Sequence, residues 1–235
     1  MPSRPENDRT AHHRGAIFIL ISLLVVLLIA VVLGIVGVAL ASGGVALQAL
    51  LRNPLAEPFI LGLSTGAGVG IIAHEYVVMR LIDAGYDARA YYGTTHLGAL
   101  GGALVCMTIV YLAGRKRGMI DPLGLLLTGV VLSTINGAII VLINYFSGPA
   151  GINPDLARWM MGFLDESATQ QTILAVGVVT TIGLGLLIWQ GPAMDVASFS
   201  DAEAMAMGVD LGRLRVMLFA VASVLAAGAV MLAGP

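Results

Sequence analysis

The residues with the clearest potential for chemistry form the stretch Gly62-Leu63-Ser64-Thr65-Gly66, which matches the pattern G-x-S-x-G. In many hydrolases this pattern marks a sharp turn between a strand and a helix, where a histidine and an acid activate the serine. Here Ser64 follows Pro58 at the start of an apolar segment, and His74 would lie about three turns further along the same helix. A serine hydrolase or intramembrane protease is therefore disfavoured.

No other group of residues predicts a catalytic or metal site. Three alternating glycines occur in the same stretch, but no strand precedes them, so a nucleotide-binding fingerprint is not supported; they are Gly66, Gly68 and Gly70. The histidines do not cluster with cysteine or carboxylates at metal-ligand spacing; they are His12, His13, His74 and His96. The single cysteine, Cys106, lies in an apolar run and forms no disulfide framework. We therefore expect no catalytic residues, no bound metal and no cofactor.

Apolar residues dominate the composition. Of the 235 residues, 58% are hydrophobic and 11% are charged, and the mean hydropathy is +0.93. A chain of this length cannot bury so much apolar surface in a core of its own, so lipid must be its solvent. The net charge of −2 gives no basic field, which argues against nucleic acid as a partner.

Long apolar runs predict membrane-spanning helices, since about 20 residues are needed to cross a hydrocarbon core of about 30 Å. Six runs qualify: Ala16 to Leu51, Phe59 to Met79, His96 to Ala113, Pro122 to Phe146, Thr172 to Gln190, and Leu214 to the end. They show no alternation of polar and apolar residues, which favours helices over a barrel. We predict an all-α, polytopic transmembrane helical bundle over residues 16–235, preceded by a polar tail at residues 1–15.

Residues 47–70 interrupt the apolar pattern. Pro54 and Pro58 each remove a backbone donor and push the preceding residue out of the helical conformation. Polar side chains accompany the two prolines at Gln48, Arg52, Asn53 and Glu57. The segment therefore predicts a break at which one membrane helix ends and the next begins.

Basic residues in the loops predict the orientation of the bundle. Six fall on one side (Arg52, Arg115, Lys116, Arg117, Arg213 and Arg215) and three on the other (Arg80, Arg89 and Arg158). The positive-inside rule places the first group in the cytoplasm. With the three arginines of the tail, the count becomes six against six if residues 16–51 cross once, and nine against three if they cross twice. Charge favours two crossings and the length of the run favours one, so the sequence leaves both open.

Residues 191–213 form a loop that differs from a simple connector. Ser200 and Glu203 have the spacing of a capping box, which predicts that a short helix begins there. This helix carries Met205 and Met207, whose flexible side chains suit a protein partner. A helix lying on the bilayer is disfavoured, because the segment has no Lys or Arg before Arg213.

Polar residues in the fourth run are candidates for lining a transport pathway, because polar groups in lipid usually face the bundle interior. The candidates are Ser133, Thr134, Asn136 and Asn144. The stronger alternative is structural: hydroxyls bond to their own helix backbone, and asparagines bond to a neighbouring helix. Away from their ends the runs lack Asp, Glu, Lys and Arg, which disfavours an ion-coupled secondary transporter. A non-transporting membrane protein fragment is a further alternative.

Three stretches resemble the FecCD family, the permease subunits of bacterial ATP-binding cassette (ABC) importers for iron siderophores, haem and cobalamin. They are VGVALASGGVALQALLRNPLAEPFILGLSTGAG at 36–68, RWMMGFL at 158–164 and SDAEAMAMGVDLGRLR at 200–215. The first is the most specific. It matches the family pattern GxxLAxxGxxxQxxxRNPLAxPxxLGxxxGA at Gly37, Leu40, Ala41, Gly44, Gln48, Arg52, Asn53, Pro54, Leu55, Ala56, Pro58, Leu61, Gly62, Gly66 and Ala67.

The resemblance implies a subunit that moves a metal chelate (iron siderophore, haem or cobalamin) across the bacterial cytoplasmic (inner) membrane and is not itself an enzyme. It implies as partners a separate cytoplasmic ATPase, a periplasmic or lipid-anchored substrate-binding protein, a second permease copy and membrane lipid. The implied ATPase-coupling residues are Ser200, Asp201, Glu203, Ala204, Met205, Met207, Gly208 and Val209. The signature loop comprises Gln48, Arg52, Asn53, Pro54, Leu55, Ala56, Pro58, Gly62 and Gly66.

Two departures from the family pattern concern length. Family members have a charged, proline-containing entry before the second helix, whereas this chain has the apolar residues Val26 to Ile29, so a helix is expected to be lost or fused. The chain also ends at residues 233–235, where the family continues into further helices. We therefore expect an incomplete permease domain with about six or seven of the family's typical ten spans.

Overall fold

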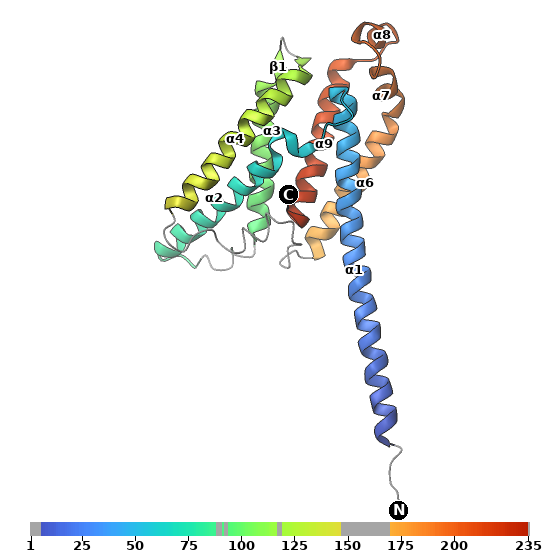
Figure 1. Cartoon of the computed structure of the whole chain (residues 1–235), viewed down its shortest axis with the longest axis vertical. Helices are drawn as coiled ribbons and strands as arrows, with labels where there is room; N and C mark the ends of the chain where they lie inside the picture. Colours follow the sequence, from blue (N-terminus) through green and yellow to red (C-terminus); the bar gives the residue numbers. More distant parts are fainter. Residues whose placement is uncertain (1–5, 88–90, 92–93, 117–118, 147–169, 235) are drawn as a thin grey trace, which may run out of the picture.

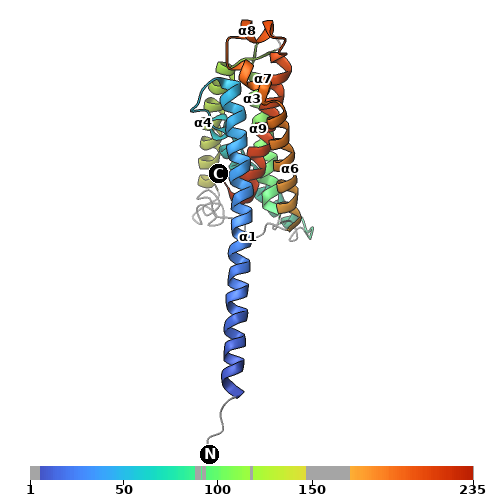
Figure 2. The same cartoon turned by 90° about the vertical axis from the view of Figure 1, so that its right-hand side faces the viewer.

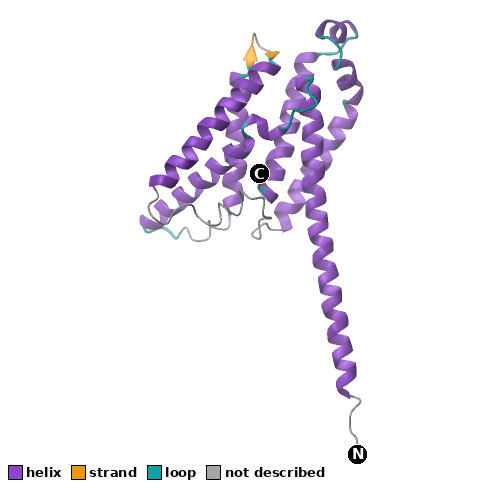
Figure 3. Cartoon of the chain, viewed as in Figure 1, coloured by secondary structure: helices purple, strands orange, loops and turns teal. Residues whose placement is uncertain are grey.

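The structure is a computed structural model that describes residues 6–87, 91, 94–116, 119–146 and 170–234. These residues are almost entirely helical, apart from one small antiparallel hairpin of β1 (Arg115–Lys116) and β2 (Met119–Ile120) (Figure 3). The helices are α1 (Glu6–Leu51), the 3-10 helix η1 (Pro58–Leu61), α2 (Leu63–Asp83), α3 (Thr95–Ala113), α4 (Pro122–Phe146), α6 (Gln170–Trp189), α7 (Gly191–Ala197), α8 (Asp201–Ala206) and α9 (Leu211–Ala233). The predicted all-α helical bundle is confirmed.

Five helices are long and apolar enough to cross a membrane. They are α1 over Ile17–Leu51, α3, α4 over Pro122–Ile143, α6, and α9. The remaining predicted run, Phe59 to Met79, is divided at Gly62 into η1 and α2. His74, Glu75 and Arg80 lower the hydropathy of α2, so only five of the six predicted spans meet this measure.

α1 is a single unbroken helix of 46 residues (Figure 2). At a rise of about 1.5 Å per residue it is about 69 Å long, more than twice the thickness of a hydrocarbon core. Residues 16–51 therefore do not fold back, and the two-crossing alternative is excluded. The helix also includes residues 6–15 of the predicted polar tail, because no proline occurs between Pro5 and Pro54. With a single crossing, the two sides of the membrane carry equal numbers of basic residues, so the positive-inside rule gives no orientation.

The bundle is organised around α9, which packs against α1, α3 and α6 and is the most buried of the five candidate spans (Figure 1). Only the carboxyl-terminal half of α1 is packed, since its side chains from Ile17 to Val31 are exposed. α2 and α3 approach closely through glycines on both helices, namely Gly66, Gly70, Gly98 and Gly102. Small residues of this kind let the backbones of membrane helices touch.

One end of the bundle carries the carboxyl end of α1, the β1–β2 hairpin and the α7–α8 segment (Figures 1 and 2). These are the three places where the sequence analysis put the larger group of basic residues, so their common side is confirmed. Between Leu51 and Leu63 the chain turns back from this end and enters the bundle through η1, which packs against α4. The predicted stretch RWMMGFL at 158–164 lies outside the described residues.

Candidate functional site

α8 is a short helix with capping interactions at both ends. At its start, the Ser200 hydroxyl accepts a hydrogen bond from the Glu203 backbone N–H at 3.2 Å, and the Glu203 carboxylate accepts one from the Ser200 backbone N–H at 3.0 Å. This is the capping box that the sequence predicts. At its end, Gly208 adopts the left-handed conformation (φ 85°), and the Val209 N–H donates to the Ala204 carbonyl at 3.1 Å. These capping interactions hold α8 helical, although a helix of six residues is too short to be stable by itself.

The outer surface of α8 is open and is apolar except for Glu203. Ala204 is fully buried against the bundle, whereas Met205 and Met207 are 60% and 61% exposed. We call the exposed residues Ala202, Glu203, Met205, Ala206, Met207 and Gly208 the α8 ridge. The ridge lies at the tip of the bundle, beyond the ends of the candidate spans (Figure 1). A surface of this kind suits a protein partner with a complementary groove.

Asp201, the first residue of α8, binds two arginines from distant parts of the chain. The Arg52 Nη2 donates to Asp201 Oδ1 at 2.6 Å, and the Arg215 Nη2 donates to both Asp201 oxygens, at 2.9 and 3.0 Å. Arg52 comes from the signature loop and Arg215 from the second turn of α9. Asp201 therefore joins three elements: the end of α1, α8 and α9.

The two arginines also set the charge state of this carboxyl group. Partial burial is the largest single influence on Asp201 and raises its pKa, but the hydrogen bonds and positive charges of Arg215 and Arg52 together outweigh it. The pKa of Asp201 is therefore below its ordinary value of 3.8. The hydrogen bonds from Ser200 likewise hold the pKa of Glu203 below its ordinary value of 4.5.

The signature loop is a folded turn whose residues have separate tasks. Arg52 has a positive φ of 48°, which is uncommon for a residue with a side chain. The Asn53 side-chain oxygen accepts the Leu55 N–H at 2.9 Å, which closes the turn around Pro54. Leu55 is 81% exposed, while Ala56 is buried. Gln48 is exposed and contributes its carbonyl, which accepts the Asn53 N–H at 3.2 Å.

The turn from η1 into α2 is buried in the bundle. Gly62 has a φ of 78°, and its carbonyl accepts a hydrogen bond from the Cys106 thiol of α3 at 3.0 Å. The Asn136 amide of α4 donates to the Thr65 hydroxyl at 3.4 Å and to the Cys106 sulfur at 3.6 Å. No strand precedes Ser64, so the strand-turn-helix that a hydrolase elbow requires is absent from this described segment.

The polar residues of α4 are mostly engaged within the protein. The Ser133 hydroxyl donates to the Gly129 carbonyl at 2.9 Å and the Thr134 hydroxyl to the Val130 carbonyl at 3.0 Å, both in their own helix. Asn136 is buried and bonds to α2 and α3. The side chain of Asn144 lies outside the described part of the structure. These contacts follow the structural alternative stated for these residues, and a role in lining a pathway stays a prediction.

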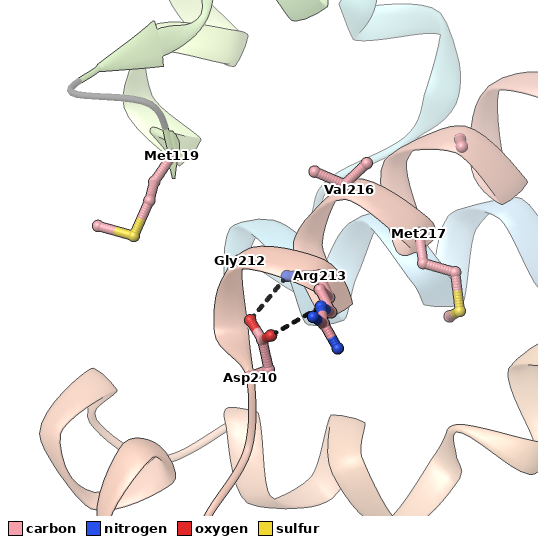
Figure 4. A pocket seen from close by; sticks show the side chains of 7 residues that line it. Met119, Asp210, Gly212, Arg213, Val216 and Met217 are labelled. Atoms are coloured by element: carbon pink, nitrogen blue, oxygen red, sulfur yellow. Dashed lines mark hydrogen bonds and ion pairs between the residues drawn. The ribbon is translucent and has the colours of Figure 1, made fainter.

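A cavity of about 470 Å³ opens beside the start of α9 (Figure 4). It is lined by Met119 of β2, by Asp210, and by the α9 residues Gly212, Arg213, Val216, Met217 and Ala220. Asp210 accepts a hydrogen bond from the Arg213 backbone N–H at 3.0 Å, and its other oxygen lies 3.1 Å from Arg213 Nε. Arg213 is thus paired with the residue that caps its own helix, and not with Asp201.

Sequence reasoning found α8 and the signature loop but missed their connection. It named Arg52 and Asp201 separately, 149 residues apart, and counted Arg215 only among the basic residues of the loops, not among the candidate site residues. Of the two contacts, only the one between Arg215 and Asp201 could have been suspected from the sequence, since these residues lie 14 positions apart on either side of the turn between α8 and α9. The Arg52 contact has no such signal, because it depends on how α1 packs against α7 and α9.

The chain is similar to known transport proteins. The profile of the FecCD transport family matches residues 9–235. The chain is 35% identical over 199 residues to a cobalamin import system permease protein BtuC of Halobacterium salinarum, covering 85% of this chain and 50% of the relative. It is 30% identical over 204 residues to the Fe(3+)-citrate import system permease protein YfmD of Bacillus subtilis, covering 85% and 56%.

A solved structure of a metal-chelate type ABC transporter in an inward-facing conformation is similar in fold. Its TM-score is 0.68 at 25% identity, and the match covers 87% of this chain and 62% of the other. The chain thus spans about half the length of the curated relatives it matches. These relatives are transport components rather than enzymes, and together with the apolar helices they identify a multi-pass protein of the inner membrane. The chain belongs to the FecCD transport family.

Proposed function

We propose that this chain acts as a permease subunit of an ABC importer that moves a metal chelate into the cell, and that the α8 ridge is its contact with a cytoplasmic ATPase. The observation that carries the proposal is the α8 ridge itself. It projects from one end of the bundle, carries two exposed methionines and is fixed to α1 and α9 through Asp201. Family membership supports the same assignment.

A rigid ridge suits the transmission of force between subunits. The capping box and the glycine turn keep α8 helical, so a push on the ridge moves it as a unit. Two of the packed helices, α1 and α9, would move with it through the Asp201 ion pairs. ATP-driven closure of the ATPase would then shift these helices and open the transport pathway to the other side.

The other partners follow from the family and from the names of its relatives. A periplasmic or lipid-anchored binding protein would deliver the chelate, and a second permease copy would complete a central pathway. The names of the relatives point to cobalamin or an iron chelate as cargo. Ser133, Thr134, Asn136 and Asn144 stay candidates for the pathway lining. In the described part of the structure no Asp, Glu, Lys or Arg is buried, which disfavours an ion-coupled carrier.

The test is the affinity of the purified permease for its ATPase. Changing Met205 and Met207 together to serine should weaken this affinity by about tenfold or more, because exposed apolar anchors at the centre of an interface dominate its energy. The matched control is Met119→Ser, which changes a 55% exposed methionine at the same end of the bundle. An unchanged affinity in the double variant, with the wild-type protein binding normally, would overturn the assignment of the α8 ridge.

A further inference from the structure

We infer that Arg52 is a positioning residue, and that its ion pair with Asp201 transmits the movement of α8 to the turn that carries the chain from α1 back into the bundle. This inference rests on the proposed function, because it assigns a role within the contact between permease and ATPase. It gives the arginine of the signature loop a task that its sequence motif does not specify.

The first argument is that Arg52 holds the α7–α8 segment at two points. Its Nη2 donates to Asp201 Oδ1 at 2.6 Å, and its Nε donates to the backbone carbonyl of Ala197 at 2.9 Å. Ala197 is the last residue of α7 and Asp201 the first of α8, so one guanidinium spans the linker between the two helices. The guanidinium offers two separate donor nitrogens, Nε and Nη2, for these two acceptors, whereas lysine would have to serve both from a single nitrogen.

The second argument is the backbone conformation of Arg52. Its positive φ of 48° is unfavourable for a residue with a side chain. Glycine or asparagine would adopt this conformation more easily, so the arginine side chain must compensate through its contacts. Arg52 therefore both reverses the direction of the chain and reaches across to α8.

The third argument is the position of the loop that Arg52 begins. Residues 52–57 lead directly into η1, whose residues Ile60 and Leu61 pack against Gly129 of α4. η1 ends at Leu61. In the turn that follows, the Cys106 thiol of α3 bonds to Gly62 and the Asn136 amide of α4 bonds to Thr65, which ties the turn to α3 and α4. A displacement of α8 that pulls on Arg52 is thus passed along residues 52–57 and η1 to the helices α2, α3 and α4. Arg215 provides the separate connection to α9.

The decisive experiment is a double-mutant cycle on Arg52→Gln and Asp201→Asn, with Arg213→Gln as the control. Arg213 is 91% exposed and pairs with Asp210, so it offers a matched arginine at the same end that does not contact Asp201 (Figure 4). Two quantities are measured for each protein: amide hydrogen exchange of the α7–α8 segment in the permease alone, and stimulation of ATP hydrolysis by the chelate-loaded binding protein in the assembled transporter. ATPase affinity is measured alongside.

If the ion pair positions α8, both single variants raise the exchange rates of the α8 amides by about three- to tenfold, and their effects are less than additive in the double variant. Stimulation of ATP hydrolysis falls in parallel in both single variants. Arg213→Gln changes none of these. Should Arg52→Gln fail to fold, Arg52→Lys, which keeps the charge but replaces two donor nitrogens by one, is expected to give an intermediate exchange rate.

Two other outcomes separate the failure of this inference from the failure of the proposed function. Normal exchange and full stimulation in Arg52→Gln would overturn the role of Arg52 and leave the ATPase contact standing. A wild-type protein that binds no ATPase would overturn the proposed function. The exchange measurements would still decide whether Arg52 positions α8, since they need no partner.

Discussion

Gly70 of α2 and Gly102 of α3 lie in direct backbone contact: a Cβ added at Gly102 would lie 2.7 Å from the Gly70 Cα. Gly66 and Gly98 extend the same contact along the two helices. The Gly66 and Gly70 carbonyls of α2 face Gly102 and Gly98 of α3, and the Gly98 and Gly102 carbonyls face Gly70 and Gly66 in return. No side chain fits between backbones at this separation. The pair therefore fixes where α2 crosses α3, and with it the position of the η1–α2 turn.

Replacing Gly102 by alanine is expected to destabilise the protein by about 1 to 3 kcal/mol, because the new methyl group overlaps backbone atoms that cannot move aside. Gly101→Ala is the matched control, since a Cβ at Gly101 meets no atom within 4 Å. Thermal unfolding in detergent would compare the two. Equal transition temperatures for both variants would show that α2 and α3 separate without cost.

Replacing Asn136 by leucine is expected to lower the free energy of unfolding by about 1 kcal/mol. The change removes the amide that bonds to Thr65 and to Cys106, and interhelical hydrogen bonds in membrane proteins contribute about this much. Thr134→Val is the control, because Thr134 is exposed and bonds within its own helix. Chemical unfolding followed by circular dichroism would measure both; a smaller loss for Asn136→Leu than for Thr134→Val would contradict the role of Asn136 as a link between helices.

Replacing Ser200 by alanine is expected to loosen α8 by about 1 kcal/mol, because the Glu203 N–H loses its side-chain acceptor. Ser200→Thr keeps a hydroxyl that can accept from the Glu203 N–H and donate to the Glu203 carboxylate, and should restore most of the protection. Hydrogen exchange at residues 203–209 would report the change. Fast exchange in all three proteins, wild type included, would mean that the capping box does not hold α8.

Acid is expected to release α8 from the bundle. The pKa values of Asp201 and Glu203 are depressed in the folded protein, so the detached segment binds more protons than the folded one. The stability that these carboxylates contribute is complete above their ordinary pKa values of 3.8 and 4.5 and is lost as the pH falls through the lower folded values. Protection factors of α8 measured from pH 6 down to about pH 2 should fall, and less steeply in Asp201→Asn, where Arg52 and Arg215 face no titrating group.

The orientation of the bundle is testable by cysteine labelling. Met207→Cys presents an exposed thiol on α8, while the native Cys106 is buried and should stay unreactive. A membrane-impermeant maleimide should label Met207→Cys only when the cytoplasmic face of the membrane is accessible. Tyr86→Cys follows the end of α2, at the other end of the bundle, and should show the opposite pattern (Figure 1). Labelling of Met207→Cys from outside intact cells would refute the proposed ATPase contact.

Much of the local structure was predictable because it depends on neighbouring residues. The run Pro122 to Phe146 coincides with α4, since a proline and a long apolar stretch define it without reference to the rest of the chain. The capping box at Ser200 and Glu203 was equally local. Residues 16–51 were ambiguous because length and charge favoured different answers, and the continuity of α1 removed the ambiguity.

By itself, the sequence determined that lipid is the solvent, which apolar runs form helices, and which family pattern the chain carries, because composition, prolines and capping residues act over a few positions. The tertiary structure alone decided that Arg52 meets Asp201 across 149 residues, that Asn136 meets Thr65, and that Gly70 meets Gly102. Helix packing sets these contacts: in lipid the backbone bonds are satisfied within each helix, so the side chains that let helices approach decide which polar groups meet.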